Sequence, residues 1–203
     1  MSNAELFALI TLAAVGTFTP GPNTALSATL AANHGLRRAL PFVCAVPAGW
    51  GILLALNAGG LGTIVLGLPP LRWGLLLMGA LYLLWLAYQL ASSQRLSDAR
   101  TTLHIGFRQG VMLQFVNIKA WLLAMSVVSG WVIGHDNTGE RLLETLPVFM
   151  GFGLASNLTY AWVGASLRDW LRGPNETAQR LQGFNRLMAL ALLGTAAWMG
   201  SQL

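Results

Sequence analysis

The apolar stretch LFALITLAAVGTFTPGPNTALSATL, Leu6 to Leu30, decides the fold class, because it combines a membrane-length run with a break in its middle. It contains no charged residue and exceeds the roughly 20 residues that an α-helix needs to cross a bilayer core. At its centre, Pro20 and Pro22 remove two backbone hydrogen-bond donors, and Gly21 between them is conformationally permissive. The sequence therefore predicts a membrane helix that is broken at Pro20-Gly21-Pro22.

The composition extends this interpretation to the whole chain of 203 residues. Hydrophobic residues make up 55% and charged residues only 9%, whereas an ordinary soluble domain is about 25% charged. So few charges cannot cover the surface of a soluble protein, and the apolar content excludes a disordered chain. The single cysteine, Cys44, excludes a disulfide scaffold. The net charge of +5 does not indicate nucleic-acid binding, because the basic residues are spread thinly between apolar runs. A polytopic membrane protein remains.

Six nearly uncharged stretches are each about 17 residues or longer, enough for a helix across a bilayer core of about 30 Å. They cover residues 6–30, 39–67, 72–91, 109–133, 144–167 and 187–203. The sequence thus predicts an all-α protein with six transmembrane helices in one domain, residues 1–203. Its halves, about 1–92 and 109–203, hold three spans each and would insert with opposite orientation, which is the inverted-repeat plan of many secondary transporters.

The basic residues predict the orientation in the membrane. Nine of the 12 Lys and Arg residues lie in the first, third and fifth loops between the spans. They are Arg37, Arg38, Arg95, Arg100, Arg108, Arg168, Arg172, Arg180 and Arg186. By the positive-inside rule these loops are cytoplasmic, so both termini are expected on the outside.

Lys119 is the one clearly ionisable residue inside the predicted spans. All seven acidic residues lie in loops or at span ends, so no intramembrane carboxylate can pair with it. A lysine at this depth costs about 2.5–3.5 kcal/mol on insertion scales, and such residues usually face a cavity. Three interpretations are open: Lys119 binds an anionic group of a substrate, it is neutral at rest and carries a proton during transport, or it snorkels or donates only to backbone carbonyls.

Further polar residues accompany Lys119. Gln114 and Asn117 follow helical spacing, whereas Asn117 and Lys119, two residues apart, face nearly opposite sides of a regular helix. They can address one cavity only if the helix is irregular there or several helices crowd around it. Asn157 and Tyr160 also lie at helical spacing in the fifth span, where interhelical hydrogen bonding is the simpler interpretation for each.

The leading functional hypothesis is a secondary exporter of small polar metabolites that carry a carboxylate, rather than an enzyme. Lys119 and backbone amides freed from Pro20 to Asn23 would hold the carboxylate. The predicted substrate-binding residues are Lys119, Asn117, Asn23, Pro20, Gly21, Pro22 and Gln114, and the predicted cavity-lining residues are Asn157, Tyr160 and Trp121. Lys119 is also the candidate proton carrier. The expected partners are the substrate and the lipid bilayer, with no nucleic acid, cofactor or metal, and a homo-oligomer stays open.

Two alternatives belong to other classes. A passive pore for small anionic metabolites would also use a lone lysine, although no ring of like charges is visible unless the chain oligomerises. An intramembrane Ser-Lys hydrolase is disfavoured, because Ser126 follows Lys119 by seven residues, about 10 Å along a helix axis.

At Thr19-Pro20-Gly21-Pro22-Asn23 and at Asn117-Ile118-Lys119, the chain resembles the LysE/RhtB family of amino-acid exporters. The resemblance continues at His34-Gly35, in residues 79–89 and in residues 114–119, and the run Leu113 to Asn117 is most similar to the cysteine/O-acetylserine exporter branch. It implies six helices in a bacterial inner membrane, export of amino acids or close derivatives, and drive from an ion gradient, with protons as the expected ion. The family pattern is Asn-Pro-Lys, so Ile118 in place of proline does not enforce a second break.

Overall fold

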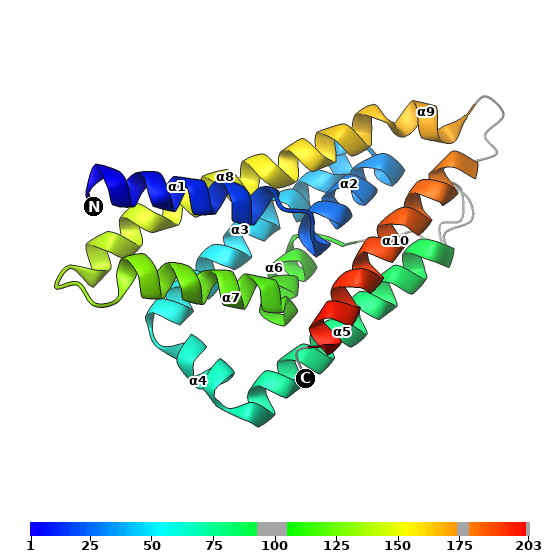
Figure 1. Ribbon diagram of the computed structural model, residues 1–203. Helices are drawn as coiled ribbons and strands as arrows, with labels where there is room; N and C mark the ends of the chain where they lie inside the picture. Colours follow the sequence, from blue (N-terminus) through cyan, green and yellow to red (C-terminus); the bar gives the residue numbers. More distant parts are fainter. Residues whose placement is uncertain (93–104, 174–178, 202–203) are drawn as a thin grey trace.

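The computed structural model describes residues 1–92, 105–173 and 179–201, and the described residues form helices with no strand. The predicted all-α class is thus confirmed for this part of the chain, which Figure 1 shows as a bundle. The helices are α1 (Asn3–Phe18), α2 (Pro22–His34), α3 (Leu36–Ala58), α4 (Leu61–Gly67), α5 (Pro69–Ser92), α6 (Phe107–Val116), α7 (Ile118–Val127), the π-helical η1 (Val128–Val132), α8 (Thr138–Ser166), α9 (Arg168–Arg172) and α10 (Gln179–Gly200).

The predicted break in the first span is confirmed. Helix α1 ends at Phe18, α2 begins at Pro22, and the two helices are bent by 53°. Pro22 occupies the first helical position, where its missing N–H costs no helical hydrogen bond. The Thr24 hydroxyl accepts a hydrogen bond from the Gly21 N–H at 2.9 Å, so a side chain caps the new helix. Local chemistry therefore both ends α1 and starts α2.

The fourth predicted span is also broken, although it lacks the proline. Helix α6 ends at Val116, and the continuation from Ile118 is bent away from it by 72°. Asn117 supplies the N-cap, because its side-chain oxygen accepts a hydrogen bond from the Lys119 N–H at 3.2 Å. Of the two alternatives left open by the sequence, the first applies, since the helix is irregular at Asn117.

Two other span boundaries need correction. Residues 39–67 do not form one uninterrupted helix, because Gly60 adopts a left-handed φ of 91° between α3 and α4. Helix α10 begins at Gln179, about two turns before the predicted residue 187.

The number of membrane spans is only partly supported. Helices α3 and α5 are each long and apolar enough to cross a membrane, and the two bent pairs raise the number of such spans to four. Helices α8 and α10 have 29 and 22 residues but are not among the spans that length and hydropathy identify. The count of six spans remains a prediction.

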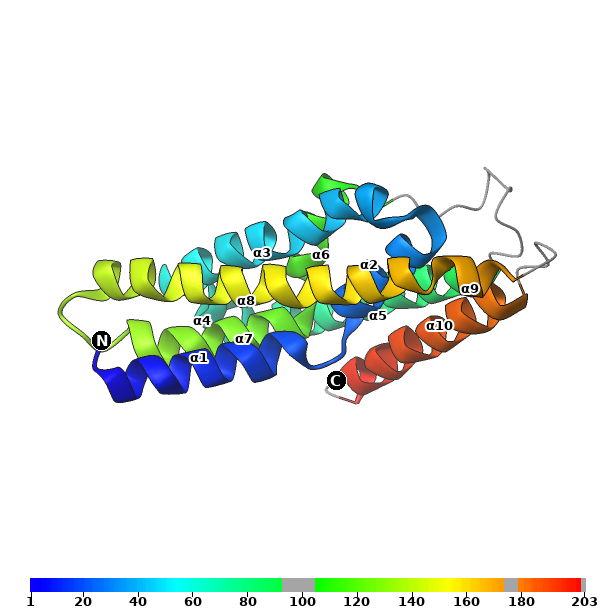
Figure 2. The ribbon, with the colours of Figure 1, turned by 90° about the horizontal axis from the view of Figure 1, so that it is seen from above.

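Close helix packing covers the break at Asn117 with protein, whereas Phe18, Thr19 and Pro20 at the first break are exposed. Helix α8 lies along α1, α2 and α3, and α10 packs along α5 (Figures 1 and 2). A side-chain carbon added at Gly164 of α8 would overlap the backbone oxygen of Ala28, and one at Gly79 of α5 would overlap that of Val116 at the end of α6. Irregular backbone is tolerated within a bilayer when protein covers it in this way.

The two ends of the bundle carry different charged groups. At one end, Arg141 forms a salt bridge with Glu5 at 3.1 Å, and the terminal ammonium of Met1 pairs with Glu144 at 3.2 Å, which ties α1 to the start of α8. At the opposite end, Arg168 of α9 lies close to the turn at Gly35, between α2 and α3. The first and fifth predicted loops therefore meet on one side of the molecule.

Candidate functional site

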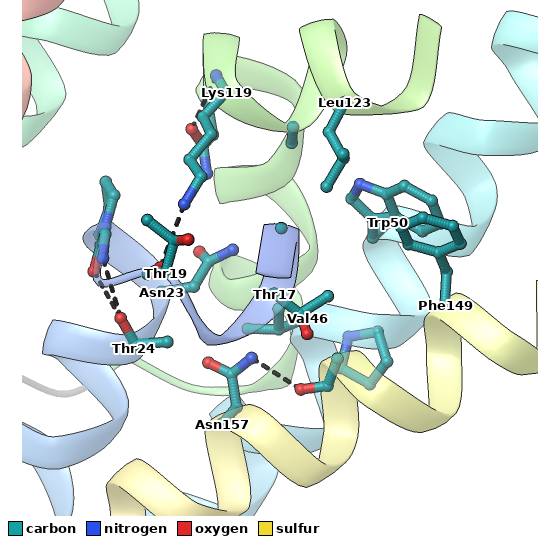
Figure 3. A pocket seen from close by; sticks show the side chains of 17 residues that line it. Thr17, Thr19, Asn23, Thr24, Val46, Trp50, Lys119, Leu123, Phe149 and Asn157 are labelled. Carbon is teal, nitrogen blue, oxygen red and sulfur yellow. Dashed lines mark hydrogen bonds between the residues drawn. The ribbon is translucent and has the colours of Figure 1, made fainter. Parts of the chain in front are cut away.

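The two helix breaks meet at a cavity of about 60 Å³ (Figure 3). Its lining comes from the α1–α2 break, from α3, and from α7 and α8. The lining residues are Gly16, Thr17, Thr19, Gly21, Pro22, Asn23, Thr24, Val46, Pro47, Trp50, Asn117, Lys119, Ala120, Leu123, Phe149, Gly153 and Asn157. Lys119, Thr19 and Thr24 lie on one side, and Trp50 and Phe149 lie on the other. The volume suits roughly four or five water molecules, so it matches a small solute.

Lys119 contacts the end of α1 on its own side of the cavity. Its Nζ donates a hydrogen bond to the Thr19 carbonyl oxygen at 3.1 Å, and no acidic side chain is among the lining residues. Of the three interpretations of Lys119, this conformation displays donation to a backbone carbonyl. An ammonium group has three donors, so the bond to Thr19 leaves donors for a ligand in the cavity.

Helix α8 supplies two further donors to the carboxyl end of α1. The Tyr160 hydroxyl donates to the Phe18 carbonyl at 3.1 Å, and the Ser156 hydroxyl donates to the Thr17 carbonyl at 2.7 Å. The last carbonyls of a helix have no partner within the helix and carry partial negative charge. Three side chains, with Lys119 as the only charged one, therefore cap these carbonyls in place of the missing helical turn.

The first turn of α2 contributes free amide donors to the cavity. Pro20 and Pro22 have no N–H, and the Gly21 N–H is already donated to Thr24. The prediction of freed amides throughout Pro20 to Asn23 is therefore too broad, since Asn23 carries the one remaining donor of that range. The N–H groups of Asn23 and Thr24 belong to a helical first turn and have no partner one turn earlier.

Positive charge at the cavity comes from two helix starts and from Lys119. The N-termini of α2 and α7 both line it, and each carries partial positive charge in addition to the Lys119 ammonium. Backbone amides at a helix start, together with a nearby cation, are a suitable site for a carboxylate.

Gln114 acts behind the cavity wall rather than in it. Its side chain is fully buried and is not among the lining residues. Asn23 Nδ2 donates to Gln114 Oε1 at 2.8 Å, and Gln114 Nε2 donates to Asn23 Oδ1 at 3.1 Å and to the Gly110 carbonyl at 3.0 Å. This reciprocal amide pair joins the start of α2 to α6, so Gln114 positions one helix break against the other.

The predicted cavity-lining residues are only partly brought together. Asn157 lines the cavity, where its Oδ1 accepts from the Ser27 hydroxyl at 2.9 Å. Tyr160 and Trp121 are not among the residues that line it. Trp121 is buried and donates to the Phe115 carbonyl at 2.9 Å, because the turn at Asn117 directs its ring back onto the end of α6.

Comparison with known proteins identifies the family. Residues 14–202 match the LysE type translocator family. The chain belongs to this family. A cysteine/O-acetylserine efflux protein of Klebsiella pneumoniae subsp. pneumoniae is 30% identical over 166 residues, which cover 81% of this chain and 84% of that protein. Proteins of the same name from Escherichia coli O1:K1 / APEC and Salmonella choleraesuis are 28% and 27% identical over 164 residues, with the same coverage of both chains. No solved structure matches.

Membership in the LysE family makes this chain a membrane transport protein, which confirms the resemblance inferred from the two motifs. Within the described residues, no group of three His, Cys, Asp or Glu side chains could hold a metal ion. The polar groups of the cavity lie at the breaks of two helices, which is where other transporters with discontinuous helices bind their substrates.

The sequence analysis missed the aromatic wall of this translocator's cavity. Trp50 of α3 stacks on Phe149 of α8, with ring centroids 4.7 Å apart and an interplanar angle of 20°. An aromatic residue inside an apolar run is usually a packing residue, so its type alone did not distinguish Trp50. The neighbouring residues Gly49 and Gly51 could have indicated Trp50 in the sequence, because they allow α6 and α8 to approach α3 closely.

Proposed function

We propose that this LysE-family protein is a secondary active exporter of amino acids or close derivatives, of the cysteine/O-acetylserine type or other neutral amino acids, across the bacterial inner membrane. The observation that carries the proposal is the position of Lys119 beside the start of α2, in a cavity whose lining residues include no acidic side chain. An amino acid supplies the carboxylate that this arrangement accommodates. The names of the relatives, which are efflux proteins, support this substrate class.

The α1–α2 break offers complementary groups to both charges of an amino acid. The carboxylate would accept hydrogen bonds from Lys119 and from the backbone N–H groups of Asn23 and Thr24. The ammonium would lie near the carbonyls at the end of α1, because each carbonyl oxygen has a second lone pair beyond the one that its capping side chain uses. The N–H groups at the start of α2 and the carbonyls at the end of α1 thus complement the two opposite charges of a zwitterionic amino acid.

Proton coupling is assigned to Lys119 in this proposal. It is the only ionisable side chain among the residues that line the cavity. Binding of the carboxylate would draw the ammonium away from the Thr19 carbonyl. Lys119 would take up and give up a proton during the transport cycle, which would couple export to the proton gradient.

The proposal includes two structural repeats of opposite orientation, residues 1–92 and 109–203. Each begins with a helix pair bent at a short break, α1–α2 and α6–α7. Helix α8 packs against the first pair and α3 against the second, while α3 contacts α8 and α5 contacts α10. Exchange of the two halves preserves this pattern of contacts, which supports the inverted-repeat arrangement and its six spans.

Efflux from proteoliposomes tests the function. The purified protein is reconstituted and supplied with a panel of labelled neutral amino acids, including cysteine and O-acetylserine. We expect at least one of them to move against its own concentration gradient when an opposing pH gradient is imposed. The proton flux should rise and fall with the flux of that amino acid. Flux only down the gradient, indifferent to pH, would indicate a passive pore. No flux of any amino acid in the panel would contradict the proposal.

The proposed orientation places both termini on the periplasmic side. We expect a membrane-impermeant maleimide added to intact cells to label Asn137→Cys, and to label Ser97→Cys only after permeabilisation, because residue 97 lies in the predicted third, basic loop. Position 97 is outside the described residues. The background is Cys44→Ala, which removes the single native thiol. Labelling of position 97 in intact cells would reverse the topology.

A further inference from the structure

The indole N–H of Trp50 has no acceptor in the described protein. The side chain is 8% exposed, and its Nε1 atom is buried without a hydrogen-bond partner among the described residues. An indole nitrogen can only donate, and a buried donor is rarely left without an acceptor in a native structure. Two other indoles illustrate the usual outcome, because Trp121 donates to the Phe115 carbonyl and Trp131 donates to the Glu5 carbonyl.

This donor lies on the side of the cavity opposite Lys119. Trp50 lines the cavity, and its indole nitrogen lies on the edge of the ring nearest Leu123 (Figure 3). The stack on Phe149 holds the ring plane, so the N–H cannot rotate away without breaking that contact. Apolar residues also line the cavity, among them Val46, Pro47 and Leu123.

We propose that Trp50 determines substrate specificity by donating a hydrogen bond from its indole N–H to an acceptor atom in the substrate side chain. This inference rests on the proposed function, in which Lys119 and the start of α2 hold the α-carboxylate at the other side of the cavity. The favoured substrate class is a short neutral amino acid whose side chain contains an uncharged oxygen acceptor, such as a hydroxyl, ether or ester. The apolar residues around Trp50 disfavour a charged side chain, and a cavity of about 60 Å³ disfavours a long or aromatic one.

A matched pair of substrates isolates the hydrogen bond. O-Methylserine and norvaline have side chains of nearly the same shape and differ by an ether oxygen in place of a methylene group. We expect the wild-type protein in proteoliposomes to prefer O-methylserine in kcat/KM by about 5- to 10-fold, as for one hydrogen bond to a neutral group. Trp50→Phe keeps an aromatic ring on Phe149 and removes the N–H, so its preference should fall to about twofold or less.

A control variant separates this effect from loss of an indole elsewhere. Trp131→Phe also removes an indole hydrogen bond, but Trp131 is not among the cavity-lining residues, so its preference should equal that of the wild type. An unchanged preference in Trp50→Phe, including equal slowing of both substrates, would overturn the proposal. If the wild type transports no amino acid at all, the proposed function fails first, which is a different result from transport without this preference.

A binding measurement keeps the test independent of transport and of folding yield. The protein labelled with ¹⁵N-tryptophan gives one indole N–H signal per tryptophan, and comparison with Trp50→Phe assigns the signal of Trp50. We expect O-methylserine to move that signal downfield, in the direction of a stronger hydrogen bond, and norvaline to leave it nearly unmoved. Equal shifts with both amino acids would overturn the proposal.

Discussion

Replacement of Lys119 by methionine should lower amino-acid efflux from proteoliposomes by about 100-fold or more, the range expected when a desolvated carboxylate loses its charged partner. Methionine preserves an unbranched apolar stem of similar length, so the packing around the side chain changes little. The carboxylate would then rely on the first-turn amides of α2 alone. The measurement is the initial efflux rate of protein whose unfolding temperature in detergent matches the wild type.

Tyr160→Phe is the matched control for this variant. Tyr160 and Lys119 donate to neighbouring carbonyls at the end of α1, with nearly equal distances of 3.1 Å, but only Lys119 lines the cavity. Loss of the neutral hydroxyl should reduce efflux by about tenfold at most. Equal reductions in the two variants would make Lys119 a cap of α1 and not a substrate ligand. Full transport by well-folded Lys119→Met would remove it from the site altogether.

Gln114→Leu should lower efflux by roughly 10- to 100-fold, because it leaves the Asn23 amide without its reciprocal partner. Leucine approximates the volume of glutamine but cannot hydrogen-bond, so the start of α2 loses its connection to α6. Asn23 lines the cavity, and the loss should therefore raise KM for the substrate as well as lower the rate. Efflux kinetics over a range of substrate concentrations provide the measurement.

A second amide pair provides the control for general loosening. Asn33 and Asn185 donate to each other at 2.9 and 3.1 Å, which joins α2 to α10 with the same chemistry, and neither residue lines the cavity. Asn185→Leu should lower the unfolding temperature about as much as Gln114→Leu, since each removes the side-chain partner of one half-buried asparagine amide. Transport per folded molecule should fall only in Gln114→Leu. Parallel loss of transport in both variants would contradict a positioning role for Gln114.

The Asn117 break shows where residue-level reasoning stopped short. Without proline at position 118, the sequence alone left a continuous helix open, yet Asn117 is a residue type that favours N-cap positions and could have indicated a helix start. The break places Asn117 at the N-cap and Lys119 in the first turn of α7, so the regular helix that would point them to opposite sides is absent there. The two polar residues therefore share a cavity through a change of helix direction.

The amino-acid sequence by itself determined the membrane class, the break at Pro20-Gly21-Pro22 and the isolated position of Lys119 among apolar residues. These follow from properties of individual residues, because proline lacks an N–H in any context and a lysine among apolar residues is costly to insert. Only the tertiary structure decided which groups meet. Lys119 reaches the Thr19 carbonyl, Gln114 joins Asn23 and Trp50 stacks on Phe149 across long separations in sequence. Such contacts depend on how closely the helices approach and at what angle, which helical spacing within one segment cannot specify.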